Sequence, residues 1–390
     1  MNVTYKDNDT IFFLEGRIDS GNAAETEYKI FQRLSAKYVN KIIFSLENLE
    51  YISSAGLRVL LKVKKKYPDI SVVNVSKDLY EIFDMTGFTN ILNVEKPLKE
   101  ISVKNCDIIS DTNNSTVYRI SKDNVLKLLK GKNTRKKAEE EFKRAKTAFI
   151  GGVSTAIPYE IVSCNSSYGL IYELLACRPL SDYISEHPED TSKCAVRFAQ
   201  LLRDIHSLDI DLSGLPNIKD LFMQYLDNSL TIYNKEEINT IGSLIKAMPD
   251  DKRLIHNNYQ PDNIMVHDNE LILIDMGNVC CGHPIFDFGS SWLTFRGSVD
   301  THLTKYTGLS SENRMLFWVK FLQTYYDEKG SSALNLIEKQ IAASAQLRLA
   351  LALGSYESYS SSLKTIFVEN MRKNFFPKAG EYKEAILSIK

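Results

Sequence analysis

Short apolar runs alternate with segments of helical periodicity along the first hundred residues of the chain. Three runs rich in Ile, Val, Leu and Phe predict strands, at residues 10–14, 41–46 and 70–75. Apolar residues that recur every three or four positions predict helices between and after them, at residues 24–38, 56–67 and 79–85. Strands separated by helices of this length favour a small α/β domain with a mostly parallel sheet.

The second of these helices is preceded by two adjacent serines, Ser53 and Ser54. A hydroxyl at the start of a helix caps free backbone N–H groups. A phosphate on either serine would meet the same N–H groups and the positive end of the helix. The residues alone therefore leave two interpretations open, a plain helix cap and a phosphorylation site.

Residues 1–100 resemble a STAS domain, the fold of bacterial anti-sigma-factor antagonists. Three blocks that occur in order carry the resemblance, at residues 16–19, 54–57 and 79–87. It implies that Ser54 is a switchable phospho-acceptor and that a regulatory protein binds the domain. The family often has Asp before this serine, and Ser53 occupies that position here.

The pattern changes after residues 95–105, a polar stretch that predicts a linker. Residues 116–120 and 125–129, with a polar turn between them, predict a β-hairpin. Lys127 lies among apolar neighbours on the second strand. A lysine in such surroundings needs a counter-charge or a wet cleft.

A predicted helix supplies the counter-charge. Thr134 can cap it, and Glu141 lies on its apolar face. That face is formed by Ala138, Phe142, Ala145 and Phe149. We therefore expect an ion pair between Lys127 and Glu141, which in a kinase holds the lysine on the α- and β-phosphates of the nucleotide. An edge lysine and a solvated glutamate are the structural alternative.

Two further segments contain side chains whose oxygen atoms can bind a metal ion. They are residues 256–263 and the end of the strand predicted at 271–274. Asn263 and Asp275 can bind Mg²⁺. Asn258 occupies the position expected for the catalytic base, and its amide oxygen is too weakly basic to take a proton at neutral pH. The chain is therefore expected to bind ATP or another nucleoside triphosphate with Mg²⁺. An active kinase, a nucleotide-binding pseudokinase and a domain that has lost nucleotide all remain open.

From residue 106 to residue 390 the chain resembles the aminoglycoside phosphotransferase and choline kinase superfamily, which has a kinase-like fold. The matching pieces, in order, are Lys127, Glu141 and residues 256–263, 275–277 and 282–287. The resemblance implies two lobes after the STAS-like domain of residues 1–100. These are a β-rich N-lobe at residues 101–175 and a mostly helical C-lobe at residues 176–390.

The same resemblance assigns roles to single residues. Asn263 and Asp275 would ligate Mg²⁺, and His256 and Asp287 would support the loop structurally. Ser115, Glu173 and Leu175 would contact the nucleotide, the first in the phosphate-covering loop and the other two at the hinge. The substrate would be a small molecule with a hydroxyl group, an amine or a sugar.

The chain departs from the superfamily in three places. Gln260 stands where the superfamily has a second His in the loop. Asn257 and Asn258 stand where it usually has Gly and Asp. The phosphate-covering loop, residues 110–115, contains no glycine, although glycine lets backbone N–H groups approach phosphate closely. Asp111 would bring a negative charge near the phosphates. The two asparagines of this loop tolerate left-handed backbone and would partly replace glycine.

The composition and charge of the chain limit the classes of partner that it is expected to bind. Lys and Arg number 48 against 49 Asp and Glu, and a net charge of -1 gives no reason to expect nucleic acid. The 6 cysteines show no C-x-x-C spacing, which predicts reduced thiols. No apolar run approaches the roughly 18 residues of a membrane span, and the polar N-terminus differs from a signal peptide. We therefore expect a cytoplasmic protein that binds neither nucleic acid nor a membrane.

Overall fold

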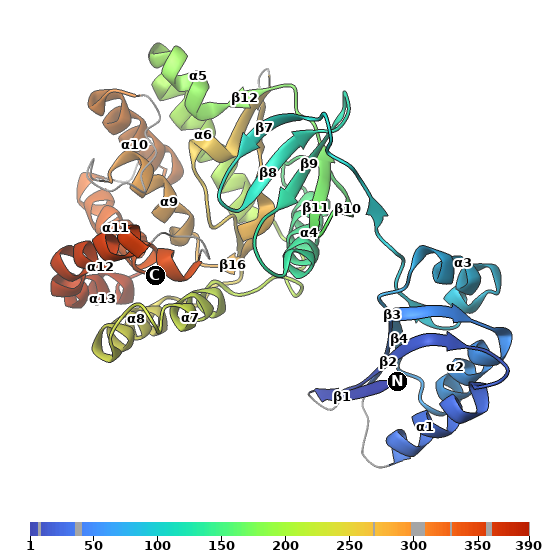
Figure 1. Ribbon diagram of the computed structural model, residues 1–390. Helices are drawn as coiled ribbons and strands as arrows, with labels where there is room; N and C mark the ends of the chain where they lie inside the picture. Colours follow the sequence, from blue (N-terminus) through green and yellow to red (C-terminus); the bar gives the residue numbers. More distant parts are fainter. Residues whose placement is uncertain are drawn as a thin grey trace. The chain divides into compact units, whose positions relative to one another are not determined.

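A computed structural model describes residues 1–6, 9–35, 41–267, 270–297, 309–327, 330–355 and 361–389. The chain forms two compact units, Met1–Lys99 and Glu100–Lys390 (Figure 1). The first unit is an α/β domain with its own hydrophobic core. The second has a β-rich lobe followed by a mostly helical lobe. The expected fold class, an α/β domain followed by a two-lobed kinase-like fold, is confirmed.

A five-stranded sheet in the order β1-β2-β3-β4-β5 forms the centre of the first unit. Its parallel strands are β2 (Asp9–Ile18), β3 (Lys41–Ile52), β4 (Ile70–Val73) and β5 (Asn93–Val94). The edge strand β1 (Asn2–Lys6), which the apolar runs did not predict, pairs antiparallel with β2. The predicted strands and helices are present, except that residues 36–38 of the first predicted helix lie outside the described residues. Strands β2 and β3 extend well beyond the predicted residues.

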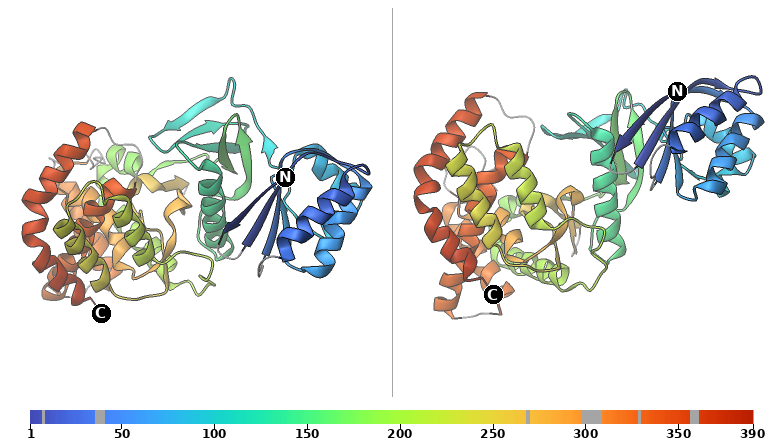
Figure 2. Two further views of the ribbon diagram at one scale, coloured as in Figure 1. Left: turned by 60° about the horizontal axis from the view of Figure 1, so that its bottom comes forward. Right: turned by 90° about the horizontal axis from the view of Figure 1, so that it is seen from below.

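Three helices connect the parallel strands: α1 (Ala23–Ser35), α2 (Ser54–Lys66) and α3 (Lys77–Met85). In β2, Phe12 and Leu14 are buried, whereas Ile11 and Phe13 on the other face are only half-buried. Only one face of the sheet is therefore fully covered, and Figure 2 shows the helices on that side. Right-handed crossovers between neighbouring parallel strands place successive helices on the same face.

Gly56 sets the distance between α2 and the sheet. A Cβ at this position would come within 2.7 Å of Ile52 Cγ1 and 2.8 Å of Ile18 Cγ2. The ends of β2 and β3 are also joined at this point. The N–H of Ser53, which follows β3, donates to the carbonyl of Ile18, the last residue of β2, at 2.8 Å. The small residue therefore lets the first turn of α2 pack directly on β2 and β3.

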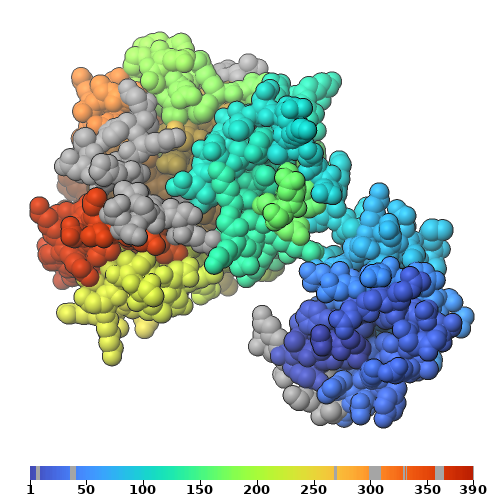
Figure 3. Space-filling model, in the orientation of Figure 1, coloured from blue at the N-terminus to red at the C-terminus, as the bar shows by residue number. Residues whose placement is uncertain are grey.

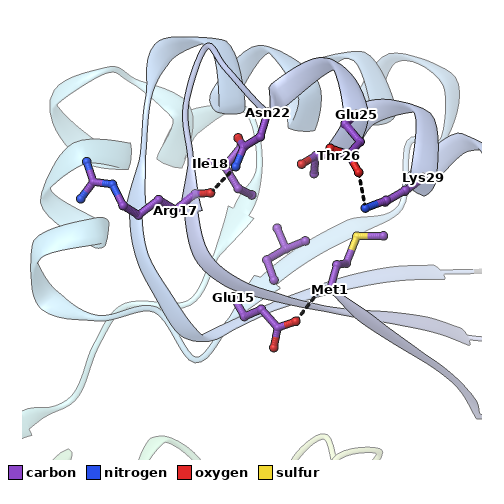
Figure 4. Close-up of a pocket in the computed structure, with 9 residues that line it drawn as sticks. Met1, Glu15, Arg17, Ile18, Asn22, Glu25, Thr26 and Lys29 are labelled. Atoms are coloured by element: carbon purple, nitrogen blue, oxygen red, sulfur yellow. Dashed lines mark hydrogen bonds and ion pairs between the residues drawn. The ribbon is translucent and has the colours of Figure 1, made fainter.

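A polar hollow of about 160 Å³ lies beside α1 in the first unit (Figure 4). Four of its charged groups form two pairs, because the amino group of Met1 contacts Glu15 and Lys29 contacts Glu25 at 2.6 Å, and the guanidinium of Arg17 lies over the ring of Tyr51. Asn22 closes one end by donating to the carbonyl of Arg17 at 2.7 Å.

The β-rich lobe of the second unit is a six-stranded sheet in the order β6-β10-β11-β9-β8-β7. Its strands are β6 (Lys99–Glu100), β7 (Asp107–Asp111), β8 (Ser115–Arg119), β9 (Asn124–Leu129), β10 (Pro158–Cys164) and β11 (Ser167–Glu173). The predicted hairpin is β8–β9. The predicted linker is partly structured, because Ile101 and Val103 pack on one face of this sheet.

Helix α4 (Thr134–Ile150) packs against the other face of the sheet through Ala138 and Phe142. The expected cap at Thr134 is wrong by one residue. Asn133 occupies the N-cap with left-handed backbone, and its side chain makes no capping hydrogen bond.

The helical lobe contains short strand pairs and long helices. Its strands are β12 (Arg178–Pro179), β13 (Arg253–Ile255), β14 (Ile264–His267), β15 (Glu270–Leu273) and β16 (Cys280–Gly282). Its helices are α5 (Leu180–Glu186), α6 (Thr191–Ser207), α7 (Ile218–Asn228), α8 (Lys235–Ala247), α9 (Ile285–Phe295), α10 (Ser311–Tyr325), α11 (Ser331–Ser355), α12 (Ser361–Asn374) and α13 (Ala379–Leu387). Figure 3 shows the surface of α8 in yellow. Within the described residues, no helix combines the length and apolarity that a bilayer span requires.

Aromatic rings in tilted and edge-to-face contact lie in the core of the helical lobe. Phe198 of α6 lies 4.4 Å from Tyr259, 4.8 Å from Phe321 and 5.3 Å from Phe317, measured between ring centroids. Tyr259 belongs to the segment 256–263, and its hydroxyl donates to the carbonyl of Phe198 at 2.7 Å. The aromatic core therefore anchors the loop that carries the candidate site.

Candidate active site

Three elements bring charged side chains together at the junction of the two lobes of the second unit. Lys127 of β9 has its Nζ 2.8 Å from Glu141 Oε1 on α4. The same Nζ lies 2.6 Å from Oδ1 of Asp275, which follows β15. The expected Lys127–Glu141 pair is thus present, and Asp275 completes a cluster that joins the β-rich lobe to the helical lobe.

Tyr172 is a fourth member of this cluster that the sequence analysis did not single out. Its hydroxyl donates to Glu141 Oε1 at 2.9 Å. In the register of β11 and β9, Leu170 lies opposite Lys127 and Tyr172 opposite Val125. Side chains two residues apart share a face of the sheet. The alternation in β11 therefore places Tyr172 on the same face as Lys127.

Close packing of α4 against the turn after β15 fixes the position of Glu141. A Cβ at Gly277 would lie 3.0 Å from Glu141 Oε2. Arg144, one turn further along α4, donates to the carbonyl of Gly277. Glycine at this position therefore lets the carboxylate of Glu141 approach the segment that contains Asp275.

The charges in the cluster shift one another's ionisation. Burial alone would lower the pKa of Lys127, but the carboxylates of Asp275 and Glu141 outweigh it and raise that pKa. The ammonium of Lys127 in turn lowers the pKa of Asp275 against the effect of burial. Burial and then Glu141 raise the pKa of Tyr172. Near neutral pH the cluster is therefore a cation between two carboxylates, with a neutral phenol donating to one of them.

Asp287 of α9 binds the backbone of the loop at residues 256–263. Its Oδ2 accepts the N–H of His256 at 2.9 Å, and its Oδ1 accepts the N–H of Asn257 at 2.5 Å. His206 of α6 contacts Oδ2 through Nε2 at 2.9 Å, and Tyr325 lies 2.7 Å from the other ring nitrogen. The sequence did not assign His206 or Tyr325 to this site, because the chain separates both residues widely from Asp287.

His256 ties the same loop to the strand that precedes Asp275. Its buried imidazole donates from Nε2 to the carbonyl of Ile274 at 3.1 Å. Burial lowers the pKa of His256 and favours the neutral ring. The loop and the end of β15 are therefore held side by side.

Asn258 and Asn263 close the loop on itself beside Asp275. The Nδ2 of Asn263 donates to the carbonyl of Asn258 at 2.9 Å. The carbonyl of Asn263 accepts the N–H of Ile274 at 2.8 Å. A hydrogen bond from the side chain of Asn258 helps to lower the pKa of Asp275. The residue in the position of the base therefore contacts the carboxylate that was expected to ligate metal.

Asp111 lies on the face of the sheet opposite Lys127. Lys127 of β9 is in register with Val117 of β8, so these two side chains share a face of the sheet. Asp111 of β7 is in register with Thr116, the residue before Val117 on β8. Side chains of successive strand residues point to opposite faces, so Asp111 and Thr116 lie on the other face. Asp111 Oδ1 accepts bonds from Lys130 Nζ and Thr116 Oγ1, both at 2.5 Å. The negative charge that Asp111 was expected to bring near the phosphates is therefore paired with the ammonium of Lys130.

The phosphate-covering loop uses its backbone N–H groups internally. The hydroxyl oxygen of Thr112 accepts the N–H of Asn114 at 3.3 Å and that of Ser115 at 3.1 Å. Neither Asn113 nor Asn114 adopts left-handed backbone, so the expected replacement of glycine by these residues is wrong. Ser115 itself is buried on the face of the sheet that carries Lys127.

The expected hinge follows the last residue of β11, Glu173. Its N–H donates to the carbonyl of Ile157 at 3.1 Å, and its Oε2 accepts the N–H of Ile157 at 3.4 Å. Leu174 donates to the carbonyl of Asp123 at 2.8 Å. Leu175 is half-buried where the chain passes towards the helical lobe. Glu173 is thus paired within the β-rich lobe.

Family comparisons identify both units. Residues 106–313 match the model of the phosphotransferase enzyme family, which spans slightly more than half of the 390 residues. Residues 1–101 match the model of the STAS domain. The chain belongs to the phosphotransferase enzyme family and carries a STAS domain at its N-terminal side, which confirms both resemblances.

Known proteins resemble each unit separately. The "Putative anti-sigma factor antagonist BtrV" of Bordetella bronchiseptica (strain ATCC BAA-588 / NCTC 13252 / RB50) is 32% identical over 85 residues, 21% of this chain and 72% of that protein. The ADP-bound aminoglycoside phosphotransferase APH(2'')-Ib is 16% identical, with 81% of this chain and 100% of that chain covered and a TM-score of 0.49. A choline/ethanolamine kinase family protein from Mesorhizobium loti is 13% identical, with 72% and 92% covered and a TM-score of 0.46.

Proposed function

We propose that the second unit binds ATP, or another nucleoside triphosphate, with Mg²⁺ and transfers the terminal phosphoryl group to a hydroxyl of a small amine or sugar. The observation that carries this proposal is the position of Lys127 between Glu141 and Asp275. A half-buried ammonium held by two carboxylates at a junction of lobes is what a phosphoryl-transfer site needs to bind phosphates. Membership of the phosphotransferase family supports the same reaction class.

Each residue of the cluster has a role in this proposal. Lys127 binds the α- and β-phosphate oxygens of the nucleotide, and Glu141 and Tyr172 orient its ammonium. Ser115 lies on the same face of the sheet as Lys127 and lines the phosphate side. Leu175 contacts the adenine at the hinge. Glu173 is better explained as a residue that fixes the hinge backbone, since its carboxylate accepts the N–H of Ile157.

The donor set of Asn263 and Asp275 fits Mg²⁺. An amide oxygen and a carboxylate are the hard oxygen ligands that this ion takes from proteins. Because Asn263 donates from Nδ2 to Asn258, its Oδ1 is left for a ligand. The side chain of Asp275 is 34% exposed, so its second oxygen can reach the cleft. Bound there, Mg²⁺ would neutralise charge on the phosphate oxygens.

Asn258 limits how the substrate hydroxyl is deprotonated. The hydroxyl oxygen forms a bond to the terminal phosphorus while the bond to the bridging oxygen breaks, and the nucleoside diphosphate leaves. The Asn258 amide can accept a hydrogen bond from the hydroxyl but cannot take its proton. The proton passes to a phosphate oxygen or to water. Phosphoryl transfer has a loose transition state, so reaction without a strong base remains feasible at a lower rate.

A nucleotide-binding pseudokinase is the second candidate. Two observations favour it: the side chain of Asn258 is engaged with Asp275, and Thr112 occupies the N–H groups of the phosphate-covering loop. Both interactions occupy groups that would otherwise form hydrogen bonds to the substrate and the phosphates in the transition state. In this case the second unit senses a nucleotide and passes the signal through the STAS domain.

We propose that a regulatory protein binds the STAS domain and that phosphorylation of Ser54 controls this contact. Ser53 is half-buried, and its Oγ accepts the N–H groups of Ala55 at 3.2 Å and Gly56 at 3.4 Å. Ser54 is exposed at the first turn of α2. The two serines therefore divide the roles that the sequence left open, with Ser53 as the cap and Ser54 as the acceptor.

Pull-down with immobilised Ser54→Asp, Ser54→Ala and wild-type protein tests this switch. The aspartate mimics part of the phosphate charge and should change the set of bound proteins, whereas alanine should not. Identical sets from all three forms would argue against a switch at Ser54.

Thermal unfolding with ATP or ADP, with and without Mg²⁺, tests the proposed site. A ligand present at about 100 times its Kd stabilises the folded state by about 2.7 kcal/mol. We expect a rise in Tm that is larger with Mg²⁺. ADP release during incubation with a library of amines and sugars separates the two candidates: the enzyme releases ADP, and the pseudokinase binds without release. An unchanged Tm under all conditions would refute both.

A further inference from the structure

Asn257 has the backbone conformation of a glycine and the burial of a core residue. Its φ is 57°, in the left-handed region, where only glycine is free of strain and asparagine is tolerated. Only 1% of its surface is exposed. A glycine would satisfy this backbone, so the buried amide side chain calls for a separate explanation.

The side chain of Asn257 contacts a residue far along the chain. Its Oδ1 accepts a hydrogen bond from Arg348 Nη1 of α11 at 2.5 Å. Its backbone N–H is bound by Asp287 of α9. The turn is thus held by a carboxylate from one helix and a guanidinium from another. Hydrogen bonds with one charged partner are among the stronger ones in proteins.

Helix α11 is a rigid support for this guanidinium. A Cβ at Gly354 would lie 1.9 Å from the carbonyl oxygen of Tyr225, so α11 crosses α7 at backbone contact. Asn228 donates to the carbonyl of Gly354 at 2.9 Å, and Tyr233 donates to that of Ala350 at 2.9 Å. Arg348 therefore projects from a helix that cannot shift without breaking these contacts.

The turn at Asn257 determines where the next residue points. Asn258 follows directly, and its carbonyl accepts the Nδ2 of Asn263. A change in the backbone at Asn257 would move this carbonyl and release the amide of Asn263. The orientation of Asn263 Oδ1 depends on that bond.

We propose that Arg348 is a positioning residue of the active-site loop: through Asn257 it holds Asn258 and Asn263 in the orientation that Mg²⁺ binding needs. The part of this inference that concerns Mg²⁺ rests on the proposed function. The part that concerns the positioning of the loop by Arg348 does not. It assigns to α11 a direct role in the site.

Hydrogen exchange of the full chain without ligand tests the geometric part. Arg348→Met should speed exchange of amides in residues 256–263 about tenfold, because a charge-assisted bond to the turn is lost. Arg348→Lys keeps the charge and one donor and should recover part of the protection. Arg372→Met is the matched control, since Arg372 pairs with Glu237 elsewhere in the same unit and should leave these amides unchanged.

A double variant shows whether Arg348 acts through Asn257. In an Asn257→Gly background the turn keeps its backbone but has no amide to accept from Arg348. Adding Arg348→Met should then alter exchange of residues 256–263 less than about twofold. Equal acceleration in both backgrounds, or no acceleration in either, would overturn the proposal.

Binding of ADP tests the metal part. Arg348→Met should weaken ADP binding in Mg²⁺ by about tenfold, as loss of residues that orient metal ligands does, and change binding in EDTA less than twofold. Equal weakening in both solutions indicates a merely structural role and contradicts the proposal. If the wild-type protein binds no ADP, the proposed function fails, and the exchange experiments still decide the role of Arg348.

Discussion

Lys127 and Asp275 lie 148 positions apart in the sequence, and the ammonium of Lys127 is 2.6 Å from Oδ1 of Asp275. One residue belongs to a strand of the β-rich lobe and the other to the turn after a strand of the helical lobe. Glu141 and Tyr172 complete the cluster from the same face of the β-rich lobe. The cluster is therefore the point at which the two lobes share one ion-pair network.

Tyr172→Phe should destabilise the second unit by about 1–2 kcal/mol, because it removes a hydrogen bond to the carboxylate of Glu141. The change keeps the ring and its packing. Chemical denaturation of the full chain measures the effect. Tyr159→Phe, on a side chain that is 48% exposed, is the matched control and should be neutral within about 0.5 kcal/mol. Equal stability of the two variants would show that the Tyr172 hydroxyl contributes nothing.

Asn258→Asp should raise the rate of ADP release by about 10²–10⁴-fold if the protein is an enzyme that lacks only its base. A carboxylate there can take the proton of the substrate hydroxyl. Steady-state turnover with the best substrate of a library measures it. A variant that binds nucleotide but gains no turnover would favour the pseudokinase.

Gly56→Ala should destabilise the STAS domain by about 1–3 kcal/mol, as overpacking does. The added methyl would lie 2.7 Å from Ile52 Cγ1 and 2.8 Å from Ile18 Cγ2, on strands that cannot move apart freely. The unfolding transition of the first unit, followed by hydrogen exchange, reports the change. Ser54→Ala, at an exposed position on the same helix turn, should alter stability by less than about 0.5 kcal/mol.

Glu237→Gln should cost stability at neutral pH and progressively less in acid. A hydrogen bond from Arg372 lowers the pKa of Glu237 below its ordinary value of 4.5. A carboxylate with a lowered pKa contributes stability above its unfolded pKa, and that contribution disappears as the pH falls through the folded value. Unfolding at pH 7 and below pH 4.5 measures the difference. Glu236→Gln, at an exposed neighbouring position, is the control and should alter stability at pH 7 by less than about 0.5 kcal/mol. A cost of Glu237→Gln that is the same at both pH values would contradict the prediction.

The sequence predicted the parts of the fold that depend on local periodicity. The strands and helices of the STAS domain, the hairpin at Lys127 and the helix with Glu141 all have clear apolar repeats. Strand β1 was missed although Val3 and Tyr5 alternate with polar residues, because five residues at an edge give a weak signal. The position of Tyr172 in the site could also have been predicted. Tyr172 lies two residues after Leu170 on the same strand, so both side chains are on the face that carries Lys127.

Contacts between distant helices could not be predicted from periodicity. Arg348 and Asn257 are 91 positions apart, and His206 and Asp287 are 81 positions apart. No local pattern links them, because the packing of α11 on the loop 256–263 and of α6 on α9 decides which side chains meet. The face of the sheet on which Asp111 lies could not be predicted for a related reason. It depends on the register of β7 with β8, which shifts between Ile108 and Ser110.

Calorimetric titration of the full chain with ATP and Mg²⁺ tests the central claim most directly. We compare wild-type protein with Lys127→Met and with Lys130→Met. Lys130 is the matched control, because it pairs with Asp111 on the opposite face of the sheet. We predict saturable binding by wild-type and Lys130→Met protein, and at least about tenfold weaker binding by Lys127→Met. Equal affinity of all three proteins, or no binding by folded wild-type protein, would contradict the account.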